Sequence, residues 1–277
     1  SLGPEDIRRV LGWKQCLGLG EVMDFPSVIG GDETVLRKIS LAKGKIINGH
    51  APGITGKDLS AYIAAGIYSD HESVSLDEAK EKLKQGMFIM LREGSAEKNL
   101  DALLPLVNDK TYQRCMFVVD DRSCVDLLKD GDIDAVVRKA IGLGLDPVRA
   151  IQLATINPAQ YFRLEALGAV APGYMANLVV LSDLPRWQID LVFYRGQMVA
   201  KGGKPLFSLP QATSRGLTNT INIKPFNIEA LRLSASGEAE LVIEIVPGQI
   251  ITQKRMEKIK AIPDLERDIL KLVVVER

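Results

Sequence analysis

Short apolar runs alternate with stretches of helically spaced apolar residues over residues 4–164. Each run is too short for a helix, and the runs predict strands near residues 16, 46, 67, 88 and 116. Between them, apolar positions three or four residues apart predict helices at 5–13, 33–43, 56–65, 75–84, 99–107, 125–128, 133–143 and 148–155. Strands that alternate with helices in this way indicate five βα units and a parallel sheet.

One of these helices begins with a clear capping signal. Ser75 and Glu78 have the spacing of a capping box, in which each side chain bonds the backbone N–H of the other residue. Behind this cap, helical spacing predicts that Leu76, Ala79 and Leu83 face inward.

Five βα units leave two architectures open. A closed (β/α)8 barrel of the TIM type needs eight strands and typically ~250 residues, so five units match only part of one. The alternative is an open, doubly wound sheet. The predicted fold class is α/β in either case.

The pattern changes after Pro172 and Gly173, where apolar runs are separated by turn residues such as Arg195-Gly196 and Gly202-Gly203. The runs predict strands at 177–181, 189–194, 197–200, 220–223, 240–245 and 270–277. We therefore predict an α/β domain at residues 1–168 and a small β-rich domain at residues 169–277.

Four of the predicted strands lead into a side chain that can bind metal, namely Glu21, His50, His71 and Asp120. In a parallel barrel the carboxyl ends of the strands gather at one face, where active sites form. His and Asp are also common at turns, so four unrelated strand ends are the alternative. We favour a metal site and expect the four side chains to lie within ~10 Å of one another, because the cations of a two-metal site are ~4 Å apart.

The ligand types limit the chemistry. Neutral imidazole and carboxylate suit Zn, Mn, Fe or Ni, whereas thiolates suit softer metals. A carboxylate that bridges two cations would help to generate hydroxide at neutral pH. An aspartate beside that hydroxide, such as Asp120, would move its proton.

Other polar residues at the strand ends are open to two interpretations. Asp70 and Glu72 flank His71 and belong either to the site or to a solvated loop. Arg92 and Ser95 follow the strand at 88–91, where they either bond a planar polar substrate or form a plain turn. Asp121 faces the same choice, with a surface ion pair to the neighbouring arginine as its alternative.

Composition excludes several classes of function. Lys and Arg total 35, as do Asp and Glu, so a net charge of zero gives no support for nucleic-acid binding. No apolar run approaches the ~18 residues that a membrane span needs, and residues 1–6 lack the pattern of a signal peptide. Three widely spaced cysteines without a CxxC pair predict a reducing, cytoplasmic setting.

Several motifs of the chain together resemble the adenine deaminase family of the amidohydrolase superfamily. The most specific are Asn48-Gly-His-Ala-Pro-Gly53, Ser69-Asp-His-Glu72, Arg92-Glu-Gly-Ser95 and Asp120-Asp-Arg122. Further matching stretches are residues 18–26, 56–59, 61–66, 98–100, 154–159, 172–181, 246–248, 266–272 and 276–277. The resemblance extends over nearly the whole chain.

This resemblance implies a (β/α)8 barrel that carries a binuclear site for divalent metal, with Mn or Fe expected and Zn possible. It implies the hydrolysis of adenine, a small-molecule purine, to hypoxanthine and ammonia. Glu21 matches the bridging carboxylate, His50 and His71 match ligands on barrel strands five and six, and Asp120 matches the aspartate of strand eight. The resemblance assigns catalysis to Asp120 and Glu72, and substrate binding to Arg92, Ser95 and Asp121.

The sequence departs from the family pattern at three places. The His-x-His pair of the first barrel strand is absent from the sequence, Asn48 stands where Asp is expected, and Ser123-Cys124 stand where His-Pro is expected. We therefore expect the chain to form about barrel units four to eight and part of a β-domain. Such a partial barrel has open sheet edges, so we expect it to form homo-oligomers. We expect it to deaminate adenine weakly or not at all, because a two-metal site usually needs more ligands than four residues supply.

Two other functions remain open from the sequence. The chain could be a non-catalytic relative that serves in assembly or binding, because the ligand set lacks the His-x-His pair. It could also be an amidohydrolase that acts on another amide or amidine.

Overall fold

The computed structural model describes residues 2–209 and 220–275. The chain divides into two compact units, Ser1–Phe207 with Pro247–Ile250, and Ser208–Val246 with Ile251–Arg277. The predicted domain boundary after residue 168 falls within the first unit and stays a prediction.

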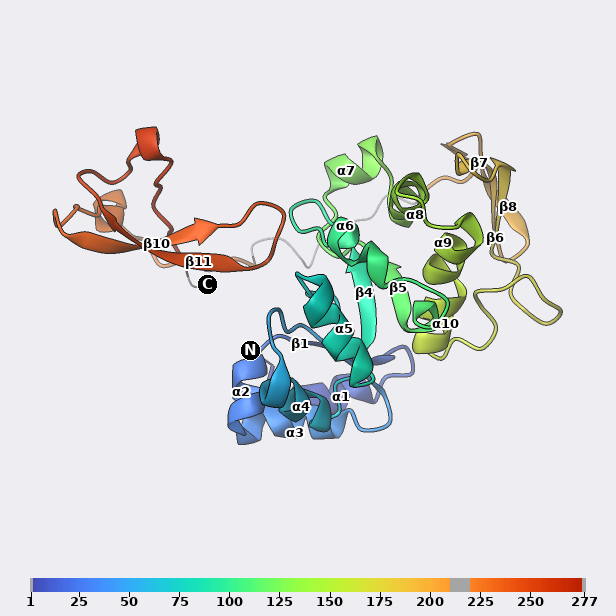
Figure 1. Ribbon diagram of the computed structural model, residues 1–277, viewed down its shortest axis with the longest axis horizontal. Coiled ribbons are helices and arrows are strands. Elements are labelled where there is room, and N and C mark those ends of the chain that lie inside the picture. The colour runs from blue at the N-terminus through green and yellow to red at the C-terminus, as the bar shows by residue number, and fades with distance from the viewer. Residues whose placement is uncertain (1, 210–219, 276–277) are drawn as a thin grey trace. The chain divides into compact units, whose positions relative to one another are not determined.

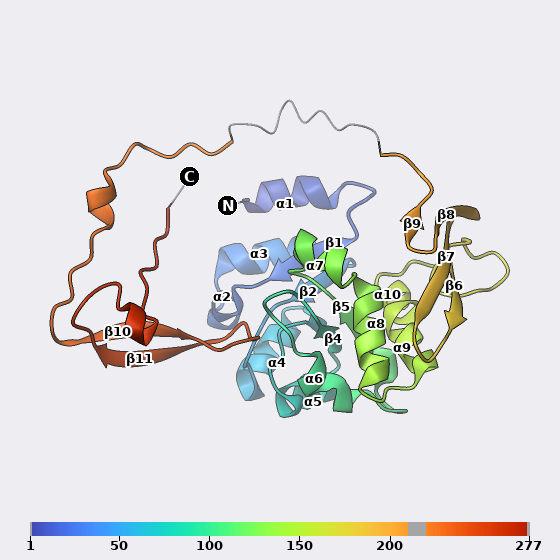
Figure 2. The ribbon, with the colours of Figure 1, turned by 90° about the horizontal axis from the view of Figure 1, so that it is seen from above.

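The first unit contains a five-stranded parallel sheet (Figures 1 and 2). Its strands are β1 (Gly18–Val22), β2 (Ile46–Gly49), β3 (Ser69–Asp70), β4 (Phe88–Arg92) and β5 (Cys115–Val118). They lie in the order β1-β2-β3-β4-β5 and pair in parallel throughout. A doubly wound sheet would reverse its strand order at a switch point, so the sequential order supports a partial barrel. The predicted α/β class and five βα units are confirmed.

Helices connect the strands and cover the sheet (Figure 2). They are α1 (Pro4–Leu11), α2 (Phe25–Gly30), α3 (Glu33–Leu41), α4 (Gly56–Ala64), α5 (Leu76–Lys84), α6 (Leu100–Leu103), α7 (Cys124–Lys129), α8 (Ile133–Gly142), α9 (Pro147–Ala154) and α10 (Ile156–Tyr161). The sequence prediction missed α2 and α10. Among the described residues, no helix has the length and apolar character to cross a membrane.

The helix predicted at 99–107 is shorter than expected. α6 ends at Leu103, and the 3-10 helix η1 (Leu104–Leu106) follows it. Pro105 explains this end, because proline has no N–H to donate to the preceding turn.

The two strands that carry part of the site lie two residues later than predicted. β1 is paired at Gly18–Val22 and not at 16–19, so Glu21 lies within the strand. β3 is formed by Ser69 and Asp70 and not by the apolar residues before them. Both residues of β3 are fully buried, and their side chains have hydrogen-bond partners. Polar residues thus occupy a buried strand here, where an apolar run was expected.

The core of the first unit fills the space between the sheet and its helices. Fully buried side chains include Leu59, Ile89, Leu91, Val136 and Leu153. The inner face of α5 differs from the prediction, because its buried residues are Glu78, Ala79 and Lys82, whereas Leu76 and Leu83 are only partly buried. A buried lysine and glutamate point to a polar network behind the strand ends.

The later part of the chain is rich in antiparallel strands. β6 (Leu178–Asp183), β7 (Gln188–Tyr194), β8 (Gln197–Lys201) and β9 (Lys204–Pro205) form one sheet in the first unit. The second unit contains the hairpin of β10 (Ala239–Ile245) and β11 (Thr252–Lys258). The sequence prediction missed β9 and β11.

Two predicted strands do not form. Residues 220–223 and 270–275 are irregular, whereas residues 276–277 lie outside the described residues. The apolar side chains Ile221 and Leu272 are exposed there. β-propensity alone does not make a strand, because a strand also needs a neighbour for its backbone groups.

Replacing Gly49 with alanine should destabilise the sheet. A Cβ on Gly49 would lie 2.4 Å from the carbonyl oxygen of Ser69 and 2.9 Å from the hydroxyl of Tyr62. Overpacking of this kind typically costs about 1–3 kcal/mol of unfolding free energy. Urea unfolding should show this loss for Gly49→Ala and none for Gly30→Ala, because nothing lies within 4 Å of a Cβ at Gly30. Equal effects of the two changes would contradict the prediction.

Candidate metal centre

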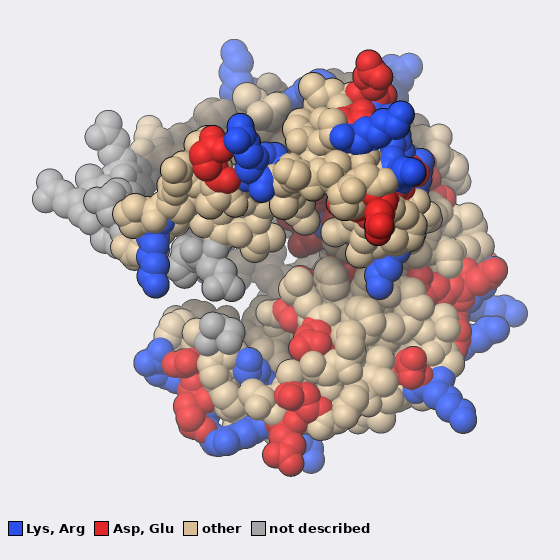
Figure 3. Space-filling model, turned by 90° about the vertical axis from the view of Figure 1, so that its left-hand side faces the viewer, with Lys and Arg blue, Asp and Glu red and all other residues tan. Residues whose placement is uncertain are grey.

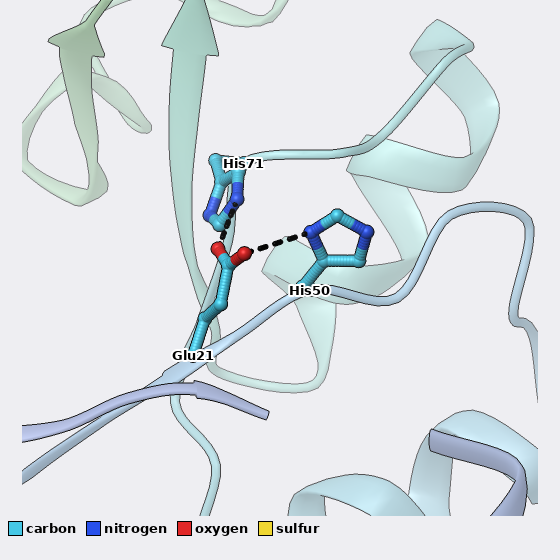
Figure 4. A group of neighbouring side chains, drawn as sticks. All are labelled: Glu21, His50 and His71. Carbon is cyan, nitrogen blue, oxygen red and sulfur yellow. Dashed lines mark ion pairs between the residues drawn. The ribbon is translucent and has the colours of Figure 1, made fainter. Parts of the chain in front are cut away.

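Three of the predicted ligands meet at the carboxyl ends of neighbouring strands (Figure 4). Glu21 lies near the end of β1, while His50 and His71 directly follow β2 and β3. His71 Nε2 lies 2.7 Å from one carboxylate oxygen of Glu21, and His50 Nδ1 lies 3.5 Å from the other. The parallel register of the strands therefore places two imidazoles on the two oxygens of one carboxylate.

The two imidazole nitrogens have the surroundings of metal ligands. His50 Nδ1 and His71 Nε2 are buried atoms, and neither has a hydrogen bond of good geometry within the described residues. Their short distances to Glu21 are therefore close approaches and not aligned N–H···O bonds. A buried nitrogen without a partner is costly in a protein interior, and coordination to a cation would satisfy both. The residues present fit a divalent metal.

A second group of potential ligands shares His71. It consists of His71, Glu72 and Asp120, whose ligand atoms all lie within 4.8 Å of one another. Glu72 is buried and approaches His71 Nε2 to 3.3 Å and His50 Nδ1 to 3.6 Å. The structure thus gathers all four predicted ligands, together with Glu72, around His71.

Asp120 differs from the other ligands in its exposure and backbone. Its side chain is 46% exposed, so it faces the open side of the site. Its φ of 50° lies in the left-handed region, which residues other than glycine rarely adopt. Such conformations are concentrated at functional sites, where the surrounding structure maintains them.

The two histidines dominate the electrostatics of Glu21. The close approach of the His50 and His71 imidazoles to its oxygens holds the pKa of the Glu21 carboxyl far below its usual range, although partial burial opposes this shift. Glu21 is therefore ionised at neutral pH, as a carboxylate that binds metal must be.

Arg92, predicted to bind substrate, lies among carboxylates. It is only 4% exposed and forms ion pairs with Glu72, Glu97, Asp120 and Asp121. The Arg92 Nη2 atom lies 2.6 Å from oxygens of both Glu97 and Asp120. Its charge therefore holds together the acidic residues on the β4 and β5 side of the site.

Asp121 is linked to the loop that follows β4. One carboxylate oxygen accepts the N–H of Ala96 at 2.7 Å, and the other lies 3.1 Å from Arg92. Burial alone would raise the pKa of Asp121, but these two donors hold it below its usual value. The neighbouring Arg122 does not pair with Asp121; it donates to the carbonyl oxygens of Glu93 and Gly131. The alternative of a surface pair between Asp121 and Arg122 is therefore wrong.

Ser95 has its hydrogen bonds within the protein. Its hydroxyl donates to Asp126 and accepts the N–H of Ser123 at 2.8 Å. Ser123 in turn caps α7 through the N–H of Asp126. Ser95 thus fixes the start of α7 through these two hydrogen bonds.

Asn48, which stands where aspartate was expected, bonds side chains of the neighbouring strands. Its amide nitrogen donates to the Ser69 hydroxyl at 3.1 Å, and that hydroxyl shares a hydrogen bond with Tyr161 at 2.6 Å. This polar chain runs between β2, β3 and α10.

Sequence reasoning missed several polar residues that surround the ligands. The Tyr62 hydroxyl accepts the N–H of His50 and donates to the carbonyl oxygen of Val22, so it ties the ends of β1 and β2 together. The Asn99 amide nitrogen donates to the carbonyl oxygen of His71. Lys82 and Glu97 complete this set. Polar residues within apolar helix faces were the signal that could have revealed Tyr62 and Lys82.

The chain forms a partial (β/α) barrel with imidazoles and carboxylates at its strand ends. These features are typical of metal-dependent hydrolases. Residues 16–199 match the model of the amidohydrolase family, which is more than half of the 277 residues. The chain therefore belongs to the amidohydrolase family, whose members typically bind divalent metal.

Curated relatives are similar along the whole chain. Adenine deaminase from Dehalococcoides mccartyi is 57% identical, and the match covers 100% of this chain and 49% of that protein. Adenine deaminase 2 from Carboxydothermus hydrogenoformans is 44% identical with the same coverage of both chains. The chain thus spans about half the length of the curated relatives it matches.

Solved structures support the fold. A β-aspartyl dipeptidase from Fervidobacterium islandicum AW-1 has a TM-score of 0.55 and 18% identity to this chain. The match covers 75% of this chain and 64% of the dipeptidase. At this identity the likeness concerns the fold alone.

Proposed function

We propose that this chain carries part of the active site of an adenine deaminase. The reaction is adenine plus water to hypoxanthine plus ammonia, in which a C–O bond replaces the C–N bond to the exocyclic amine. The observation that carries the proposal is the convergence of Glu21, His50 and His71 at the strand ends, with Asp120 close by. The whole-chain similarity to adenine deaminases supports the choice of substrate.

The proposed ligands are Glu21, His50, His71 and Asp120, and Glu21 would contribute both of its carboxylate oxygens. When bound, a divalent cation lowers the pKa of water and provides a nucleophile at neutral pH. The mixed nitrogen and oxygen donors suit Mn or Fe, and Zn is a further candidate. The two oxygens of Glu21 approach different histidines, which supports a site for more than one cation.

Two carboxylates are proposed to move protons. Asp120 is half exposed and lies beside His71, so it can take a proton from the attacking water. Glu72 is buried between His71 and Arg92, where it can hold a proton on the way to the purine ring or the leaving amine. Arg92 forms ion pairs with both carboxylates and would orient them.

The substrate-binding assignments of Arg92, Ser95 and Asp121 stay proposals. Asp121 lies on the open side of the site. Besides its ion pair with Arg92, it would accept an N–H of the purine. Arg92 contributes by orienting carboxylates, and Ser95 contributes only through the start of α7.

We also propose that the chain works within an assembly. Among the described residues, β1 and β5 each have one neighbour in the parallel sheet, so each leaves one edge open. Open edges recruit other strands, and a further copy of the chain is the proposed partner. On the face drawn in Figure 3, basic side chains are interspersed with acidic ones, which gives no support for a nucleic-acid partner. The three unpaired cysteines support a cytoplasmic location.

The purified chain, loaded with Mn(II) or Fe(II), should bind metal but deaminate adenine weakly. The described residues provide ligand groups of three side chains, and a two-metal hydrolase usually needs more ligands. Hypoxanthine formation, followed by chromatography, should stay below the usual enzyme range of ~1–10³ per second.

Co-expression with the other half of the Dehalococcoides relative should raise this rate. Sedimentation of the same samples shows whether the two chains associate. Turnover in the usual range by the chain alone would contradict the prediction, whereas failure to bind metal would overturn the proposed function and favour a non-catalytic relative.

A further inference from the structure

Two loops leave the histidine ligands, and a buried aspartate connects them. Residue Ala51 follows His50, and Glu72 follows His71. The two carboxylate oxygens of Asp70 accept the N–H of Ala51 at 2.9 Å and the N–H of Glu72 at 3.2 Å. Asp70 therefore binds the first residue after each histidine.

A second buried carboxylate repeats this arrangement further along the same loops. One oxygen of Glu78 accepts the N–H of Gly53 at 2.8 Å, and the other accepts the N–H of Val74 at 3.0 Å. Glu78 lies on α5 and is only 6% exposed. Both carboxylates thus bind each loop. They accept backbone N–H groups of two residues that lie two positions apart in that loop.

Lys82 lies between the two carboxylates. Its Nζ donates to Glu78 at 2.6 Å, to the carbonyl oxygen of Ala51 at 2.7 Å and to Asp70 at 2.9 Å. It also lies 3.3 Å from the hydroxyl of Ser73. The lysine side chain is fully buried, and none of its hydrogen bonds reaches Glu21, His50 or His71.

We propose that Lys82 is a positioning residue that fixes His50 and His71 relative to each other through Asp70 and Glu78. Lys82 neutralises two buried carboxylates that would otherwise repel each other across a low-dielectric space. Without it, the carboxylates repel each other and separate, and the loops that they bind lose their common anchor. The imidazoles at the start of those loops then lose the spacing that a metal requires.

This inference rests on the proposed metal site, and its test uses metal binding. Co(II) is the probe, because its visible spectrum reports the ligand geometry without any need for turnover. Lys82→Met keeps the length of the side chain and removes its charge and donors. The change should weaken Co(II) binding to the purified chain by about 10–100-fold, the range for residues that orient ligands, and should alter the Co(II) spectrum.

A second variant covers the case in which Lys82→Met does not fold. In Asp70→Asn/Lys82→Met, one charge of each sign is removed, and the amide oxygen can still accept the N–H of Ala51. This variant should fold, as circular dichroism will show, and should bind Co(II) more weakly than the unaltered chain. Its binding should be tighter than that of Lys82→Met where the single variant folds.

Lys45 provides the matched control. It is a partly buried lysine that directly precedes β2. Its Nζ donates to the carbonyl oxygen of Cys16, which precedes β1, at 2.6 Å. It thus links two chain segments by a lysine-to-carbonyl hydrogen bond, as Lys82 does through Ala51, but without carboxylates and at the opposite end of the strands. Lys45→Met should leave the Co(II) affinity and spectrum unchanged.

The outcomes separate this inference from the proposed site. If the unaltered chain binds Co(II) and either folded Lys82 variant matches its affinity and spectrum, the positioning role is overturned and the metal site stands. If Lys45→Met weakens binding as much as Lys82→Met, the effect is one of general stability and the inference is also overturned. If the unaltered chain binds no Co(II), the site and the inference fail together.

Discussion

Replacing His71 with glutamine should reduce the affinity of the chain for divalent metal by more than ~100-fold. His71 belongs to both candidate ligand groups, so its loss leaves neither of them complete. Loss of a residue that only orients a ligand costs ~10–100-fold, and loss of a direct ligand shared by two groups should exceed this. Isothermal titration with Mn(II) measures the change.

His50→Gln provides the comparison, because these are the two histidines of the chain and His50 belongs to one group only. It should weaken metal binding less, since His71, Glu72 and Asp120 remain. Circular dichroism checks that both variants keep their fold, because the two imidazoles lie in contact with ring centroids 5.3 Å apart. Equal losses for both variants would show that His71 has no shared role.

The strand-end positions of the ligands could be predicted from the spacing of apolar runs. His50 and His71 directly follow β2 and β3, and a parallel sheet brings such ends together. Glu21 was placed correctly at the site edge, although it lies within β1 and not after it. The predicted end of β1 was too early, because backbone pairing extends past the apolar residues of the strand.

The role of Arg92 could not be predicted in the same way. Its ion-pair partners Glu72, Asp120 and Asp121 lie between 20 and 29 residues away in sequence and on other strand ends. Local pattern places an arginine at the end of β4, but only the tertiary fold decides which carboxylates surround it. The arginine at the end of β4 lies among acidic side chains, and its contact with substrate stays a proposal.

The inner face of α5 shows a different limit of sequence reasoning. Helical spacing predicted that Leu76, Ala79 and Leu83 face the core, and it made no prediction for Lys82. The structure buries the charged pair of Glu78 and Lys82 because each satisfies the other and the loops beside it. Only half of the predicted capping box forms. Ser75 accepts the N–H of Glu78, but the Glu78 carboxylate accepts the N–H groups of Val74 and Gly53 in place of that of Ser75.

Replacing Arg92 with methionine should destabilise the chain without metal by about 3–5 kcal/mol, the usual cost of removing one partner from a buried ion pair. Arg92 is 4% exposed, and its loss leaves Glu72, Glu97, Asp120 and Asp121 without their shared cation. Like charges at this spacing repel strongly when water is excluded. Urea unfolding in a chelating buffer measures the loss.

Mn(II) should reduce this loss, and that dependence distinguishes the site from an ordinary ion pair. A cation bound to His71, Glu72 and Asp120 supplies positive charge beside the carboxylates that lost Arg92. Binding to the folded state alone adds stability that grows with metal concentration. Arg138→Met is the control, because Arg138 is half exposed and pairs with Asp134 on the surface of α8, where such a pair contributes at most ~1 kcal/mol. If Mn(II) stabilises both variants equally, the carboxylates around Arg92 take no part in metal binding.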